Sequence, residues 1–261
     1  MFTPRLLTLI VPLALVLAGC TTPAHQDSRL VYAQILEQQA EETREQNKFT
    51  PKLVSLLATD TGSGNYLFRG NMPINGHEFS YNELRAAMKE AAPGGVLPEQ
   101  YFLIDISLVN SINPNEAADL AIERQFWKVN SHLGQVINHP VYGSLTSPND
   151  YPAEVRKKLE RIPTLSSTDV LLENIQSLLL ANQANARPLV LYIHCEAGKD
   201  RTGEVAAAYA MKYQGISYLD AYANAKRIAG RELSRFSRNE LQWYAYYLRE
   251  VQKVPSIGDI R

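Results

Sequence analysis

The feature that most constrains the fold is LVLYIHCEAGKDRTGEVAAAYAM, which spans residues 189–211. A continuous apolar run ends at Cys195, a short loop containing Gly198 follows, and an alanine-rich stretch then favours a helix. Continuous apolar strands are typical of parallel sheets that are buried on both faces. Such a strand, loop and helix predict an α/β fold with a ligand site at the carboxyl end of the strand.

Other segments of the chain show the same alternation of strand and helix patterns. Apolar runs predict strands at 66–68, 101–109, 134–141 and 189–194. Helical spacing predicts helices at 80–92, 116–130, 153–162, 166–183, 203–214, 217–229 and 237–251. Capping boxes are expected at Ser80–Glu83, Ser166–Asp169 and Ser237–Glu240. The alternation predicts one α/β domain over residues 51–261, with a central, mostly parallel sheet flanked by helices.

The N-terminus has the layout of a secretory signal peptide at residues 1–19, with one basic residue before a short apolar run. The letters LAGC at residues 17–20 resemble a bacterial lipobox. This resemblance implies cleavage before Cys20, lipidation of that cysteine and, because Thr21 follows, anchoring in the outer membrane of the cell envelope. Residues 20–50 are then expected to form a lipidated tether and a peripheral helix. An ordinary signal peptide or an uncleaved anchor is the alternative.

The cysteine count and the charge narrow the classes of function. The chain has two cysteines, so lipidation of Cys20 leaves Cys195 without an intramolecular disulfide partner. Secreted proteins usually pair their cysteines or have none, so a lone thiol favours a chemical role over packing in the core. The formal net charge of -1 argues against a dedicated nucleic-acid binder, which needs concentrated positive charge.

The loop after the strand has the composition of an anion-binding cradle. The backbone amides of Glu196, Ala197, Gly198 and Lys199 are expected to point inward at the start of a helix, where the helix dipole is positive. Arg201 follows, and its planar fork is suited to gripping two phosphate oxygens. These groups all favour the thiolate form of Cys195. The sequence therefore predicts a tetrahedral oxyanion held over a sulfur nucleophile.

His194, Cys195, Gly198, Arg201 and Thr202 match H-C-x-x-G-x-x-R-T. With this signature the chain resembles the cysteine-dependent phosphatase superfamily, which includes tyrosine, dual-specificity and lipid phosphatases and cysteine phytases. The resemblance implies a tyrosine-phosphatase-like fold and a phosphocysteine intermediate, without a metal or other cofactor. It further implies that Arg201 binds phosphate, that Thr202 donates a hydrogen bond to the thiolate, and that His194 orients the loop.

Two other kinds of site are not supported by the sequence. A P-loop nucleotide site is excluded because GKDRTG lacks the Walker spacing and the Walker lysine position. His77, His132 and His139 show no ligand spacing, so no metal site is predicted.

The general acid departs from the superfamily pattern. The resemblance implies an aspartate on a loop before the helix that precedes the signature strand, and ERIPTLSST in that region has none. Asp200 beside Arg201 is the first candidate, and Asp150 in the SPNDYP loop is the alternative. Asp169 and Glu160 are further candidates, with a helix cap and a helix surface as their simpler explanations.

The substrate is expected to be a phosphorylated protein, a phosphoinositide or an inositol phosphate. Lys199 adds positive charge to the loop and so favours polyanionic ligands. Arg69 is a candidate substrate contact, with a surface salt bridge as the alternative. Three arginines at intervals of four are expected on a solvated helix face, with an extension of the anion-binding surface as the alternative: Arg227, Arg231 and Arg235.

Three functions follow. The first is a phosphatase for phosphotyrosine proteins or phosphoinositides, and the second is a phytase-like phosphatase for inositol polyphosphates. The third is an inactive phosphate-binding module, against which the presence of both Cys195 and Arg201 argues.

Overall fold

The computed structural model describes residues 48–159, 167–182 and 187–260. The expected signal peptide at 1–19, Cys20 and nearly all of the tether and helix expected at 20–50 lie outside these residues. Among the described residues, no helix combines the length and the apolar character that crossing a membrane requires.

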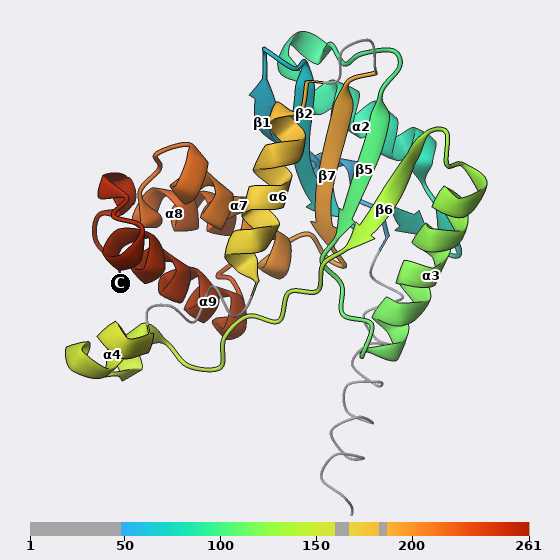
Figure 1. The fold of residues 1–261 in the computed structure, drawn as a ribbon. Coiled ribbons are helices and arrows are strands. Elements are labelled where there is room, and N and C mark those ends of the chain that lie inside the picture. Colours follow the sequence, from blue (N-terminus) through green and yellow to red (C-terminus); the bar gives the residue numbers. More distant parts are fainter. Residues whose placement is uncertain (1–47, 160–166, 183–186, 261) are drawn as a thin grey trace, which may run out of the picture.

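A mixed, mostly parallel sheet forms the centre of the described structure (Figure 1). Its strands are β1 (Ser55–Asp60), β2 (Asn65–Asn71), β5 (Phe102–Ser107), β6 (Gly134–Asn138) and β7 (Leu189–Cys195). Their spatial order is β1-β2-β7-β5-β6. Only β1 runs antiparallel to its neighbour, and every residue of the central strand β7 is buried. The predicted α/β fold with a mostly parallel sheet is therefore confirmed. A small ladder pairs β3 (Ile74–Asn75) with β4 (Glu78–Phe79).

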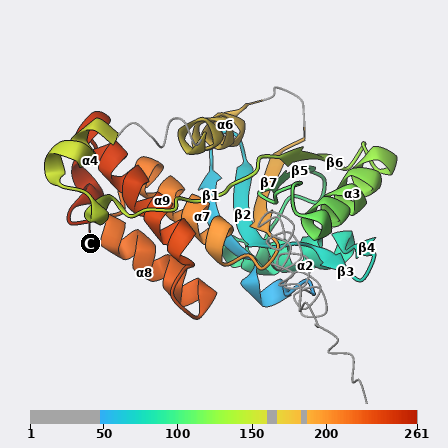
Figure 2. The same cartoon turned by 90° about the horizontal axis from the view of Figure 1, so that it is seen from below.

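Helices cover both faces of the sheet (Figures 1 and 2). One apolar core joins it to α2 (Tyr81–Ala91) and α3 (Pro114–Val129). A second core joins the opposite face to α6 (Thr168–Leu180), α7 (Asp200–Tyr213), α8 (Tyr218–Ala229) and α9 (Arg235–Tyr246). The short helix α4 (Ala153–Leu159) lies at the outer end of this second layer.

The alternation of side chains along β7 assigns its last two residues to different faces. Tyr192 packs in the α2 and α3 core, whereas Ile193 and Cys195 pack in the α6 to α9 core. Since successive side chains of a strand point to opposite faces, His194 turns toward α3 and Cys195 toward α7.

The predicted strands at 101–109, 134–141 and 189–194 are confirmed in place, with shorter or slightly shifted ends. The predicted strand at 66–68 is part of the longer β2. The strands β1, β3 and β4 were not predicted. β1 is an edge strand with half-buried residues, so it shows neither a continuous nor an alternating apolar pattern.

Two of the expected capping boxes are wrong. Ser80 makes no side-chain cap, and Glu83 accepts a hydrogen bond from Asn75 instead of from the Ser80 amide. The last long helix begins at Arg235, and its cap is Ser234, whose hydroxyl accepts from the Ser237 amide. A serine three residues earlier thus serves as the cap, and Ser237 lies inside the helix. The third box includes Ser166, which lies outside the described residues; the residue before α6 is Ser167, without a side-chain cap.

Candidate active site

The signature loop connects the end of β7 to the start of α7 and rests directly on β2. Gly198 has a φ of 66°, a conformation that glycine adopts freely. A Cβ atom at this position would lie 2.5 Å from the Gly70 carbonyl oxygen and 2.6 Å from the Asn71 amide nitrogen. The Met72 amide also donates to the Glu196 carbonyl over 3.2 Å. Only a glycine allows this close approach between loop and strand.

Arg201 is held by a carboxylate that the sequence did not indicate. Its Nη1 and Nη2 donate to the two oxygens of Glu116 over 2.8 and 2.7 Å, in a two-pronged ion pair. Burial lowers the pKa of Arg201, but the charges of Cys195 and Glu116 outweigh burial and raise it overall. The guanidinium is therefore a permanent cation with a fixed orientation. A guanidinium has five N–H donors, so donors remain for phosphate oxygens.

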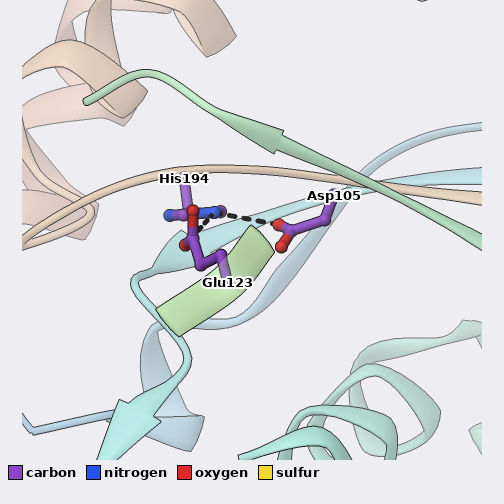
Figure 3. Close-up of side chains that lie close together, drawn as sticks. All are labelled: Asp105, Glu123 and His194. Atoms are coloured by element: carbon purple, nitrogen blue, oxygen red, sulfur yellow. Dashed lines mark ion pairs between the residues drawn. The ribbon is translucent and has the colours of Figure 1, made fainter. Parts of the chain in front are cut away.

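His194 belongs to a fully buried ion-pair cluster with Asp105 and Glu123 (Figure 3). Its Nε2 lies 2.9 Å from Asp105 Oδ1 and 3.2 Å from Glu123 Oε1, and all three side chains are 0% exposed. Trp127 Nε1 donates to the other Asp105 oxygen over 2.9 Å. The cluster joins β5, α3 and the signature histidine, so it fixes the position of the residue just before the nucleophile.

Burial and neighbouring charges raise the pKa values of two members of this cluster, Glu123 and His194. Burial raises the pKa of Glu123 to about 8. For His194, burial alone lowers the pKa, but the charges of Glu123 and Asp105 raise it to about 9. Near neutral pH His194 is therefore an imidazolium and Glu123 a protonated acid. The three residue types are also metal ligands, but a cationic histidine and the full burial fit an ion-pair network.

Arg69 lies beneath the loop, and the surface salt bridge considered for it is wrong. The side chain is 2% exposed, and its Nη2 donates to the Gly198 carbonyl over 2.8 Å. Burial lowers the pKa of Arg69 to about 10, against the opposing charge of Cys195. Arg69 therefore contacts the signature loop from the side of β2 and stabilises its backbone conformation.

Cys195 is a free cysteine, 2% exposed, at the base of the loop. Four basic side chains lie within electrostatic range of this sulfur: Arg69, His194, Arg201 and Arg231. The expected hydrogen bond from Thr202 is not formed, because in the described part of the chain its buried hydroxyl has no partner.

Asp200 is the first residue of α7 and is ion-paired. Both its oxygens accept from Arg231, over 2.9 and 2.7 Å, and the Ser234 amide donates to it over 2.6 Å. Burial raises the pKa of Asp200, but these hydrogen bonds outweigh burial and lower it overall. Asp200 is thus a carboxylate in this structure. Arg231 is not simply solvated, as expected from the sequence, but anchors the start of α7.

The other acid candidates have structural partners of their own. Asp150 accepts from the Ser147 amide over 3.0 Å in a short capping turn, and the Ser147 hydroxyl donates to Gln242. Along α9, Gln242 is eight residues beyond Ser234, the residue whose amide donates to Asp200. At about 1.5 Å per residue, these two points on the helix are about 12 Å apart. Asp169 accepts from Lys212 and Tyr244, each over 2.6 Å, in a buried cluster. Glu160 lies outside the described residues.

The remaining predicted residues lie where the sequence suggested. Glu196, Ala197 and Lys199 are partly exposed in the signature loop, whereas Gly198 is buried against β2. Arg227 contacts Asn224 within α8, and Arg235 lies over the Phe236 ring at the start of α9. Asp105, Glu116 and Glu123 were missed. The only signal for Glu116 is its place in the first turn of a helix, where acids are common.

Residues 114–223 match the model of the tyrosine phosphatase family, and the match contains the whole signature from His194 to Thr202. This match confirms the expected resemblance. No curated protein matches the chain significantly.

Several solved structures are similar to the chain in outline. The core catalytic domain of the PP-IP phosphatase SIW14 from S. cerevisiae, in complex with citrate, is 17% identical, with 73% of this chain and 86% of that chain covered and a TM-score of 0.39. Human DUSP28 is 18% identical, with 76% and 95% covered and a TM-score of 0.36. Kinase associated phosphatase, with its catalytic cysteine substituted by serine, is 13% identical, with 80% and 97% covered and a TM-score of 0.42.

Proposed function

Because residues 114–223 match the tyrosine phosphatase family, we propose that this chain is a cysteine-dependent phosphatase that hydrolyses phosphomonoesters through a phosphocysteine intermediate. The observation that carries this proposal is the position of Cys195 at the base of the glycine loop, among four cations. A module that only binds phosphate needs these cations but no nucleophile. The inactive binding module is therefore the weaker alternative.

The proposed reaction has two displacement steps. In the first, Cys195 Sγ attacks phosphorus, the S–P bond forms, and the P–O bond to the leaving group breaks as that oxygen takes a proton from an acid. In the second, water attacks phosphorus and gives a proton to the carboxylate left by the acid, and the S–P bond breaks to release phosphate and thiolate. Arg201 contacts the non-bridging oxygens in both steps and stabilises their charge. Glu116 keeps the guanidinium in one orientation, which reduces the entropy lost on reaching the transition state.

We assign the acid to Asp200, with Asp150 as the alternative. Asp200 adjoins Arg201, and a bound phosphate dianion there competes for the charge of Arg231. Loss of the Arg231 contact and the added negative charge both raise the tendency of a carboxylate to take a proton. The acid form of Asp200 is then favoured when substrate is bound. Asp150 would have to move along α9 to reach the loop.

The proposed substrates are phosphotyrosine proteins or phosphoinositides, with soluble inositol polyphosphates as the second candidate. Support for polyanionic substrates comes from Lys199, whose partly exposed side chain adds positive charge at the start of α7. The LAGC sequence supports a lipid-anchored enzyme of the bacterial cell envelope, held by Cys20.

Turnover of an aryl phosphate by the wild-type protein and by Cys195→Ser tests the activity. We expect hydrolysis by the wild type, none above background by the variant, and a phosphorylated protein in rapidly acid-quenched wild-type samples. Equal background rates with retained phosphate binding would establish the binding module instead.

Initial rates on a phosphotyrosine peptide, phosphoinositide vesicles and phytate then distinguish the substrate classes. We expect the peptide or the vesicles to exceed phytate in kcat/KM, and the reverse order would favour the phytase-like function. Detergent partitioning of wild type and Cys20→Ala tests the anchor, because only the wild type is expected in the detergent phase.

A further inference from the structure

A cavity of about 350 Å³ lies between β1, α7 and α8. Its walls are mainly small apolar side chains, which include Ala206, Ala207, Ala210, Ala221, Ala225 and Ile228. No residue of the signature loop is among the described residues that line it. The volume is within the range of sites for small organic ligands.

Two buried polar groups on the cavity lining have no partner. Ser55 and Arg69 are direct cross-strand partners in β1 and β2, so their side chains lie on the same face of the sheet. Within the described residues, neither Ser55 Oγ nor Arg69 Nε makes a hydrogen bond. Leaving a buried donor without a hydrogen bond is unfavourable. The cavity lining therefore holds two unused donors, one of them on a cationic side chain.

The charges around the cavity limit what it can take. Asp220 also lines the cavity; its carboxylate accepts from the Ser217 hydroxyl and adds negative charge. Gln214 and Asn224 complete the polar lining without charge. A ligand with several negative charges would be repelled by Asp220, whereas a single charge is balanced by Arg69. An apolar monoanion suits both the walls and the charges.

Arg69 connects this cavity to the signature loop. The same guanidinium that has a free Nε in the cavity lining donates from Nη2 to the Gly198 carbonyl. An anion that draws the guanidinium toward the cavity weakens that support. We propose that the cavity is a second site, which binds a small apolar carboxylate through Arg69 and Ser55 and thereby reduces the activity of the signature loop. The regulatory part rests on the proposed phosphatase activity, whereas the binding part does not.

Hexanoate is a suitable probe, with hexanol as its uncharged counterpart. Ligand-observed NMR on the intact protein is expected to show binding of hexanoate, much weaker binding of hexanol, and no competition by vanadate. The affinity is expected to fall about fivefold in Ser55→Ala, the effect of one lost hydrogen bond. Ala210→Phe, which fills the cavity, is expected to abolish binding, whereas the matched Ala86→Phe on the exposed face of α2 retains it.

Binding and turnover measurements on these variants test both parts of the proposal. Equal binding of hexanoate and hexanol, displacement by vanadate, or unchanged binding in Ala210→Phe would each overturn the proposal. In turnover assays, hexanoate is expected to lower kcat for an aryl phosphate in wild type and Ala86→Phe, but not in Ala210→Phe. If the protein proves inactive, the NMR results still test the binding site. Binding without any effect on kcat in an active enzyme would overturn the regulatory part.

Discussion

At the scale of single residues, the orientation of Arg201 depends on Glu116. Both guanidinium Nη atoms are bound to this one carboxylate, so its loss leaves a partly buried cation free to rotate. Glu116→Gln keeps the shape and removes the charge. We expect kcat/KM to fall by about tenfold to a hundredfold, as for a lost charge-assisted hydrogen bond of about 1.5–3 kcal/mol. Steady-state kinetics on an aryl phosphate measures this, and unchanged kcat/KM would show that Arg201 is oriented without Glu116.

The pairing of Asp200 with Arg231 makes a prediction about pH. An acid acts only while protonated, so activity is lost as pH rises through its pKa. Arg231 lowers the pKa of Asp200, and Arg231→Gln removes this effect. We therefore expect the alkaline limb of the kcat profile to move to higher pH in Arg231→Gln. The matched control is Arg227→Gln on α8, which leaves the Asp200 ion pair intact. A limb that does not move in Arg231→Gln would exclude Asp200 as the acid.

At the scale of elements, α3 supports the site at two points. Glu116 and Glu123 are seven residues apart, which is about two helical turns, so they lie on the same face of the helix. Glu116 binds Arg201 and Glu123 binds His194. One helix from the α2 side of the sheet therefore fixes both the phosphate-binding arginine and the histidine before the nucleophile.

Substitutions of Glu123 test this support. Since its pKa is raised to about 8, the side chain is largely protonated at pH 7, and Glu123→Gln imitates that form. We expect Glu123→Gln to change the free energy of unfolding by less than about 1 kcal/mol, and Glu123→Ala to lower it by about 3 kcal/mol through a cavity and lost partners. Urea unfolding at pH 7 measures both. Equal losses in the two variants would contradict a protonated Glu123.

The elements also show what the sequence could and could not predict. The strand, loop and helix around Cys195 were predicted because their pattern is local and continuous. Asp105, Glu116 and Glu123 were not, because His194 and Arg201, which they contact, are 71 to 89 positions away in the chain, and a buried acid has the same letter as an exposed one. Arg69 was identified as a site residue, but its depth depends on how β2 pairs with β7, which no local pattern gives.

At the scale of the whole molecule, the buried cluster makes stability depend on pH. Glu123 and His194 both have raised pKa values in the folded state, about 8 and about 9, against 4.5 and 6.5 as the reference values. Their contribution is full below the reference values and is lost as pH rises through the folded values. Each group changes the free energy of unfolding by up to about 1.4 kcal/mol per pH unit in that window.

We therefore expect the urea midpoint to fall steadily from pH 6 to pH 9. The Glu123→Gln variant lacks the carboxyl group that loses a proton in this range. Its urea midpoint is therefore expected to fall less steeply with pH. The comparison between the two proteins cancels contributions from groups outside the cluster of Asp105, Glu123 and His194. Parallel declines would mean that Glu123 does not titrate in the folded protein.

The direct contact of Gly198 with the backbone of β2 has a consequence for heat inactivation. Gly198 lies directly against the backbone of Gly70 and Asn71, and Arg69 of the same strand donates to its carbonyl, so the cradle cannot loosen while β2 stays in place. Catalysis should accordingly survive up to the temperature of global unfolding, without the earlier loss that is usual for enzymes whose active-site loops soften first. Residual activity and circular dichroism, followed on the same heated samples, are expected to decline together.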